Sequence, residues 1–293
     1  MVGGEKEHTL GVTIRELRDH FFSVAGWVAP HSTCDQITHG DPEREVYKVG
    51  TGWTPCSPNL EAAAADGCDL FISHETFFCG NWAPDLDSRD APWGRRRMEI
   101  LKNHDMACMN QHDTWDNFPV HGIRDSWRAF LGLTELIEER PYYYPGGNRF
   151  AARNSLALGR IAPQRLGNFA ATVAGLCSVF PSSHGVTVHG DLDAQIRTVA
   201  TGVGCHIPTL EMLELGADLL VLTFDRAFQT TIRIPLAEMN AKMLVVEHGV
   251  AEMPGMRSMA AYLEKTFPGL EATFYCLEPA ARTLIQPSKP GWQ

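Results

Sequence analysis

The segment Ser57-Pro-Asn-Leu-Glu-Ala-Ala-Ala-Ala-Asp-Gly-Cys-Asp-Leu-Phe-Ile-Ser-His-Glu75 indicates the fold class. Ser57 can cap a helix, a proline fits the first turn, and the alanines propagate the helix until Gly67 ends it. The apolar run from Asp69 to Ser73 then has the length and composition of a buried strand. The strand ends at a histidine and a glutamate, so polar groups follow it directly.

The same order of elements returns later in the chain. A helix is expected over Leu210–Leu215 with Gly216 as its stop, followed by a strand over Asp218–Thr223. A further strand, Lys242–Glu247, ends at His248. Alternating helices and buried strands predict an α/β fold in which mainly parallel or mixed sheets are flanked by helices, with reactive groups at the carboxyl ends of the strands.

Further elements and a possible lobe boundary are expected elsewhere in the chain. A capping-box pattern, Thr13-Ile-Arg-Glu16, opens a predicted helix over Thr13–Val24. An amphipathic helix is expected over Met256–Phe267, and shorter, less regular elements over Arg153–Gly190. The turn-rich stretch Tyr142–Asn148 is the best candidate for a boundary between two lobes. We therefore predict one lobe from residues 1–140 with 240–293 and a second from residues 141–239, with Gln286–Gln293 as an extended arm.

Composition narrows the function classes. The chain has 293 residues, of which 44% are hydrophobic and 20% charged, which excludes disorder for its bulk. A net charge of −10 argues against a nucleic-acid binder and against docking to an anionic membrane. No apolar run approaches the roughly 20 residues that span a bilayer. Eight cysteines without a Cys-x-x-Cys pair, and a polar start, lead us to expect a cytoplasmic protein with reduced thiols.

Three short segments pair a histidine with a carboxylate after a probable strand. They are Ser73-His74-Glu75, His112-Asp-Thr-Trp-Asp116 and His248-Gly-Val-Ala-Glu252. Imidazole nitrogen and carboxylate oxygen converging on one point can hold a divalent metal, although a single such histidine is more often hydrogen-bonded or solvated. His248 and Glu252 share a face only if their turn is helical, and Gly249 leaves this open.

These residues also carry a family resemblance. The chain resembles the Nif-three-like (Ngg-one-interacting factor three) proteins, many of them labelled GTP cyclohydrolase 1 type 2 homologues. That family has Ser-His-His-Pro, then His-Thr-x-x-Asp, and later Gly-His-x-x-x-Glu. Here the second histidine is replaced by Glu75, and Asp113 stands where threonine is usual. Four further segments resemble segments of the family pattern and occur in the same order along the chain. They are Gly122-Ile-Arg-Asp125, Phe130-Leu-Gly-Leu133, Thr201-Gly-Val-Gly204 and Gly216-Ala-Asp218 with Thr223.

The resemblance implies a dinuclear metal site at the strand carboxyl ends. Its ligands would be His74, Asp116, His248 and Glu252, with Glu75 in the place of the second histidine. The ions would be zinc, iron(II) or manganese, two per chain. Alternatively, Glu75 has lost the ligand role and the site holds one tight metal. The resemblance further implies a ring-like homo-oligomer, a hexamer.

The function expected from these features is metal-dependent hydrolysis of a small molecule, at a C–N bond in an amide or nitrogen heterocycle. Asp116 or Glu252 would bridge the ions, and His112 would be the catalytic proton shuttle. Two rival interpretations remain: a non-catalytic metal-binding or metal-delivery protein, and a regulatory scaffold in which metal is structural. An open coordination position that faces a lined pocket favours the enzyme.

Overall fold

The computed structural model describes residues 11–31, 33–78, 87–133, 135–143, 151–202, 204, 209–227 and 230–277. Most of the expected lobe boundary at Tyr142–Asn148 and the whole of the expected arm at Gln286–Gln293 lie outside these residues. The helices are α1 (Ile14–Val24), α2 (Ser57–Ala65), α3 (Pro92–Asn103), α4 (Asp113–Asp116), α5 (Ile123–Phe130), α6 (Leu166–Cys177), α7 (Thr209–Glu214), α8 (Phe224–Ala227), α9 (Thr230–Glu238) and α10 (His248–Thr266).

The strands belong to a small two-stranded ribbon and two larger sheets. They are β1 (Val12–Thr13), β2 (Ile37–His39), β3 (Glu45–Val46), β4 (Lys48–Gly52), β5 (Leu70–Ser73), β6 (Ala107–Asn110), β7 (Glu135–Tyr143), β8 (Ala151–Arg165), β9 (Thr187–His189), β10 (Gln195–Thr201), β11 (Leu219–Thr223), β12 (Met243–Val246) and β13 (Glu271–Tyr275). This is the predicted α/β fold with mixed sheets flanked by helices.

The first large sheet has the order β13-β4-β5-β6-β2. Its first four strands are parallel, and β2 runs antiparallel at the edge. Every residue of β5 and β6 is buried, as expected for central strands covered on both faces. Because β5 and β6 are parallel neighbours in register from Leu70 and Ala107 onward, their carboxyl ends lie at the same edge of the sheet.

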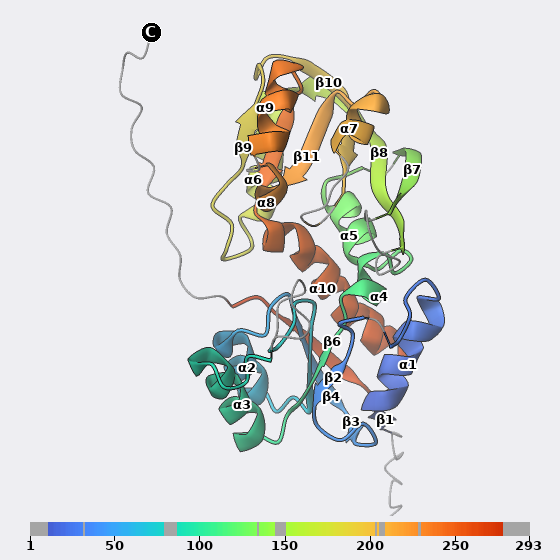
Figure 1. Ribbon diagram of the computed structural model, residues 1–293, viewed down its shortest axis with the longest axis vertical. Coiled ribbons are helices and arrows are strands. Elements are labelled where there is room, and N and C mark those ends of the chain that lie inside the picture. Colours follow the sequence, from blue (N-terminus) through green and yellow to red (C-terminus); the bar gives the residue numbers. More distant parts are fainter. Residues whose placement is uncertain are drawn as a thin grey trace, which may run out of the picture.

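The second large sheet has the order β7-β8-β10-β11-β12-β9. Strands β10, β11 and β12 are parallel, whereas β7, β8 and β9 pair antiparallel. Figure 1 shows the two sheets in separate halves of the molecule, with α5 and α10 between them. β12 belongs to this second sheet although the predicted lobe bounds assign it to the first lobe; sheet membership alone does not define a domain, and those bounds stay a prediction.

Helix α10 connects the cores of the two halves. Val250, Ala251 and Met253 in its first turns pack in the core of the second sheet, whereas Met256 and Met259 pack in the core of the first. The helix begins directly after β12, and its N-terminus is capped by the side chain of Glu247, which accepts a hydrogen bond from the Val250 amide. The residues that open α10 therefore lie between the halves.

The elements agree with expectation in part. The capping box at Thr13 and Glu16 is present, and Gly67 and Gly216 adopt positive φ after their helices. Cys56, not Ser57, holds the cap position of α2, and the Cys56 side chain makes no capping hydrogen bond. The region 153–190 is more regular than predicted, since it contains most of the long strand β8 and all of α6. Polar residues interrupt the hydrophobic periodicity in the sequence of β8. The sequence of α6 is apolar almost throughout, so it shows no clear helical periodicity.

Among the described residues, no helix is long and apolar enough to cross a bilayer.

Candidate metal centre

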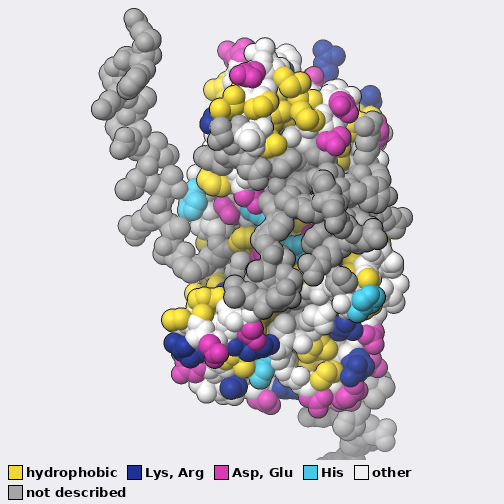
Figure 2. Space-filling view, viewed as in Figure 1, with side chains coloured by type: hydrophobic (Ala, Val, Ile, Leu, Met, Phe, Trp, Pro, Cys, Tyr) yellow, Lys and Arg dark blue, Asp and Glu magenta, His cyan; other side chains and the backbone are white. Residues whose placement is uncertain are grey.

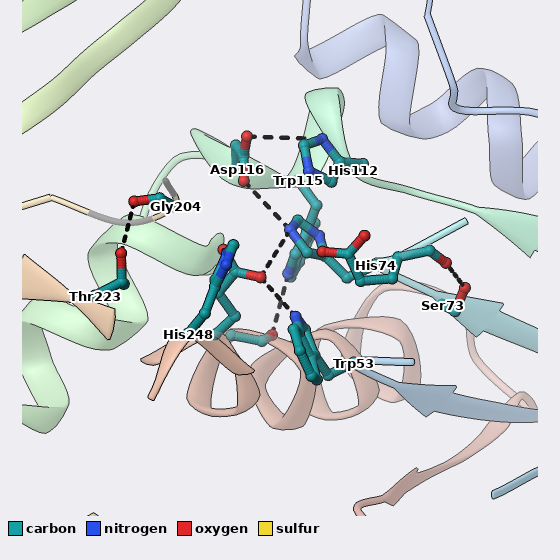
Figure 3. Close-up of polar contacts among 12 residues, drawn as sticks. Trp53, Ser73, His74, His112, Trp115, Asp116, Gly204, Thr223 and His248 are labelled. Carbon is teal, nitrogen blue, oxygen red and sulfur yellow. Dashed lines mark hydrogen bonds and ion pairs between the residues drawn. The ribbon is translucent and has the colours of Figure 1, made fainter. Parts of the chain in front are cut away.

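His74 is the central residue of the candidate site. It follows β5, is fully buried, and its Nδ1 lies 3.2 Å from the carbonyl oxygen of Gln111. Among the described residues its Nε2 has no hydrogen-bond partner, but it lies 3.5 Å from Asp116 Oδ1 and 3.4 Å from Glu252 Oε2. In Figure 3, Asp116 and His112 lie on one side of His74, and His248 and Trp53 lie on the other. The three predicted segments therefore meet at this one imidazole.

The segment that carries His112 is held by Asp35, a fully buried residue of the loop before β2. Asp35 Oδ1 accepts hydrogen bonds from the amides of His112 and Asp113 at 2.7 and 3.0 Å. Its Oδ2 accepts from the amide and the hydroxyl of Thr114 at 2.8 and 2.6 Å. One carboxylate thus satisfies the orphan donors at the start of the short helix α4 and fixes the position of His112.

His112 stacks on His74 with ring centroids 4.4 Å apart. Its Nδ1 lies 2.8 Å from Asp113 Oδ1 and 3.9 Å from Asp116 Oδ2. The side chain is partly exposed, at 17%, whereas that of His74 is completely enclosed. His112 is therefore the histidine of this pair that can exchange protons with solvent.

The turn that contains Gly249 is helical, so His248 and Glu252 share a face of α10. His248 Nε2 lies 2.7 Å from Glu252 Oε1, and its Nδ1 lies 3.0 Å from Asp225 Oδ2. The other oxygen of Glu252, Oε2, accepts a 2.6 Å hydrogen bond from the indole Nε1 of Trp53. Glu252 is buried, with an exposed fraction of 2%, and its two oxygens face different histidines.

The side chains form groups whose ligand atoms lie within 4.8 Å of one another. One group contains His74, His112 and Asp116, and another contains Glu75, His248 and Glu252. His74 and Glu75 are adjacent in sequence but belong to different groups. The amide of His74 donates to the carbonyl of Gly52, the last residue of β4, and the amide of Glu75 donates to the carbonyl of Trp53, which follows that strand.

Burial and charge set the protonation of these groups. Burial lowers the pKa of His74 to about 3, so its imidazole is neutral near pH 7. Burial raises the pKa of Asp116 to about 7, against the opposing effect of His112. Burial would lower the pKa of His248, but the charge of Glu252 and the hydrogen bond to Asp225 outweigh it and raise this pKa to about 12.

Glu252 shows the reverse balance. Burial would raise its pKa, but the charges of His248 and His74 outweigh this effect and lower the pKa to about 2. The negative charge of the Glu252 carboxylate is thus balanced by the proton on His248. A divalent cation at the same place could balance this charge instead. Burial also raises the pKa of Glu75. The charge of this cluster is unfavourable without bound protons or cations.

The chemistry of the donor set suits a divalent metal. The enclosed Nε2 of His74 is a buried polar atom without a hydrogen-bond partner among the residues that the structure describes. It faces two carboxylate oxygens that cannot donate to it unless they are protonated. Imidazole nitrogen with carboxylate oxygen is a common ligand set for zinc, iron(II) and manganese. The residues therefore fit a divalent metal.

The sequence patterns missed three residues that support the site. Asp225 comes shortly after β11 and could have been found by the same rule, a polar residue at a strand exit. Trp53 follows β4 in the same way. Asp35 lies in an irregular loop, and no local pattern indicates that its carboxylate reaches the amides of the His112 segment.

Comparison with solved structures supports the fold. Protein ybgI, described as of unknown function, shares 18% identity with a TM-score of 0.72, covering 92% of this chain and 100% of that one. A Bacillus cereus protein related to NIF3 shares 14% identity with a TM-score of 0.74, covering 94% and 99%. Reduced HcgD from Methanocaldococcus jannaschii shares 14% identity with a TM-score of 0.66, covering 91% and 99%.

Comparison with curated protein sequences gives no match. The family model described as Duf34/NIF3 (NGG1p interacting factor 3) matches residues 36–280, which contain both large sheets and all the candidate ligands. The match thus covers well over half of the chain and includes all three histidine–carboxylate segments. The chain therefore belongs to the Duf34/NIF3 family.

Proposed function

We propose that this protein is a metal-dependent hydrolase that cleaves a C–N bond in a small amide or nitrogen heterocycle. The observation that carries the metal dependence is the Nε2 of His74, which has no hydrogen-bond partner in the described part of the chain and faces the carboxylates of Asp116 and Glu252. A buried polar atom without a partner costs about 1–3 kcal/mol, and a cation bound among these three residues would remove that cost. The choice of reaction rests on the resemblance to GTP cyclohydrolase 1 type 2 homologues.

Two ions per chain are supported by the two neighbouring ligand groups. His74 and Asp116 would hold one ion, and Glu75 and His248 the other. Glu252 is the better candidate for the bridging ligand, because its Oε2 faces His74 and its Oε1 faces His248. Asp116 instead directs its two oxygens to His74 and His112, which lie in the same group.

Divalent cations in such a site supply Lewis acidity to the electrophile and lower the pKa of water near the scissile bond. His112 would carry the proton, because its ring is partly exposed and Asp113 holds its Nδ1. Asp225 and Trp53 orient His248 and Glu252 through the hydrogen bonds described above. His74 is fully buried and would serve as a ligand.

The test combines metal analysis with a substrate screen. Glu252→Gln is compared with Glu264→Gln, an exposed glutamate of the same helix whose side chain accepts a hydrogen bond from the Ala272 amide. We expect two ions in the wild-type protein and in Glu264→Gln, fewer than one in Glu252→Gln, and metal-dependent hydrolysis within a panel of amides and nitrogen heterocycles. Unchanged metal content in Glu252→Gln would contradict the site.

The outcome also separates the rival functions. His112, Asp116 and His248 are partly exposed, so ions could be delivered from this site as well as used in it. Two exchangeable ions without hydrolysis of any compound in the panel would favour metal delivery. A tightly held, closed metal would favour the regulatory scaffold. We further propose a cytoplasmic homo-hexamer that acts on a small molecule and has no nucleic-acid or membrane partner.

A further inference from the structure

A third group of potential ligands lies beside the centre described above. It contains Cys34, His112 and Asp113, and its ligand atoms also lie within 4.8 Å of one another. Cys34 belongs to the loop between α1 and β2, and its Sγ lies 3.9 Å from Asp113 Oδ1. That same oxygen lies 2.8 Å from His112 Nδ1. Thiol, carboxylate and imidazole therefore meet around one point.

The surrounding hydrogen bonds orient these groups toward one another. Asp113 Oδ2 accepts a 2.6 Å hydrogen bond from the Thr33 hydroxyl, which leaves Oδ1 directed at Cys34 and His112. Asp35 lies 3.8 Å from the thiol, but its oxygens already accept four hydrogen bonds, so it anchors the loop. Cys34 and His112 are partly exposed, which leaves the group accessible from solvent.

The donor set differs from that of the candidate metal centre. That centre offers imidazole and carboxylate, whereas this group adds sulfur, which favours thiophilic ions such as Zn²⁺ and Cd²⁺. The carboxylate comes from Asp113, the position where this chain departs from the threonine of the family pattern. The arrangement is thus built from this chain's own residues.

We propose that Cys34, His112 and Asp113 form an accessory site for one thiophilic divalent cation. His112 is shared, because its Nδ1 lies 2.8 Å from Asp113 and 3.9 Å from Asp116. A cation bound by Cys34 and Asp113 would replace the hydrogen bond between His112 and Asp113. It would hold the His112 imidazole on the side of Cys34 and Asp113. The thiol proton is released to the buffer. Binding of this cation therefore competes with the role of His112 in the candidate centre. That competition rests on the proposed function, whereas the binding of the cation does not.

The experiment is a Co²⁺ titration of the full chain, followed by near-ultraviolet absorption. A thiolate-to-cobalt charge-transfer band reports sulfur ligation, and cobalt held by histidine and carboxylate gives no such band. We expect the band to appear after the first two equivalents have bound. It should be absent in Cys34→Ser and retained in Cys56→Ser, a partly buried cysteine whose Sγ donates to the Leu277 carbonyl. Asp113→Asn should weaken the cobalt affinity reported by the band by about 10–100-fold.

The possible results divide cleanly. No thiolate band in the wild-type protein, or a band that survives in Cys34→Ser, would overturn the proposal. A band that is lost in Cys34→Ser, together with an unchanged cobalt affinity in Asp113→Asn, would show that the thiol binds cobalt without Asp113. That result would also refute the three-residue site. A protein that fails to hydrolyse any tested compound but shows the expected band would refute the proposed function and leave the accessory site supported.

Discussion

Gly249→Ala tests whether the first turn of α10 positions the candidate ligands through Trp53. A Cβ atom added at Gly249 would lie 2.4 Å from both Cε3 and Cζ3 of the Trp53 ring and 2.8 Å from Cδ2. Carbon atoms in van der Waals contact are about 3.5–4.0 Å apart, so the indole or the helix must move. The indole also donates the 2.6 Å hydrogen bond to Glu252, so its displacement disturbs a candidate bridging ligand.

The magnitude follows from three terms. Overpacking of this kind costs about 1–3 kcal/mol, while alanine regains about 1 kcal/mol of helix propensity relative to glycine. Loss of the indole hydrogen bond to a carboxylate adds about 1.5–3 kcal/mol. We expect a net loss of about 1.5–5 kcal/mol in the free energy of unfolding, and a decrease in Tm of about 3–20 °C for a chain of this size. Metal affinity should fall by about 10-fold or more, because Trp53 orients a ligand.

Thermal unfolding by calorimetry and metal affinity by competition with a chelating dye provide the two measurements. Gly175→Ala is the matched control: this exposed glycine lies within α6, and an added Cβ would meet nothing within 4 Å. It should stabilise the protein by up to about 1 kcal/mol and leave metal affinity unchanged. If Gly249→Ala were as stable as Gly175→Ala and bound metal equally well, the proposed role of the Trp53 contact would be refuted.

The other predictions concern the candidate ligands, their support and the assembly. His248→Ala should remove most of the bound metal while far-ultraviolet circular dichroism stays unchanged; unchanged metal content would exclude His248 as a ligand. Glu75→Gln should lower the occupancy of one ion more than the other, and Glu75→His should change the metal preference; a metal-bound structure with the Glu75 carboxylate beyond roughly 4 Å from every ion would contradict the ligand role. Asp35→Asn should lower stability by about 2–3 kcal/mol, because an amide cannot accept all four buried hydrogen bonds, and unaltered thermal unfolding would argue against this anchor. Light scattering should give the mass of a hexamer at micromolar concentration, and a monomer would contradict the expected assembly.

The strand exits could be predicted because local sequence determines them. The apolar run before His74 is a buried central strand, and the run before His248 is another, so the rule that polar groups gather at carboxyl ends grouped segments that the structure places close together. The start of α10 could not be predicted. Gly249 and Pro254 both weaken a helix locally, and the buried contacts that stabilise it come from both halves of the molecule.

The supporting residues were missed for a related reason. Asp35 lies in no local pattern and acts through contacts with residues far away in sequence. Trp53 follows a strand, but its contact with Glu252 is equally distant in sequence. Local periodicity carries no information on such contacts, which depend on how the loops cross. The sequence therefore indicates which side chains are candidates, whereas their division into groups, with His74 in one and Glu75 in another, requires the three-dimensional structure.

The position of α10 has a consequence for cooperativity. His74 follows a strand of the first sheet, whereas His248 and Glu252 follow a strand of the second. Ions held among them would bind only when both halves are folded and correctly docked. At a free metal concentration 100 times the dissociation constant, this linkage adds about 2.7 kcal/mol to stability for each independent ion. Metal availability would then govern whether the halves unfold as one unit or separately, so the same side chains would act as a reversible crosslink as well as a reaction centre.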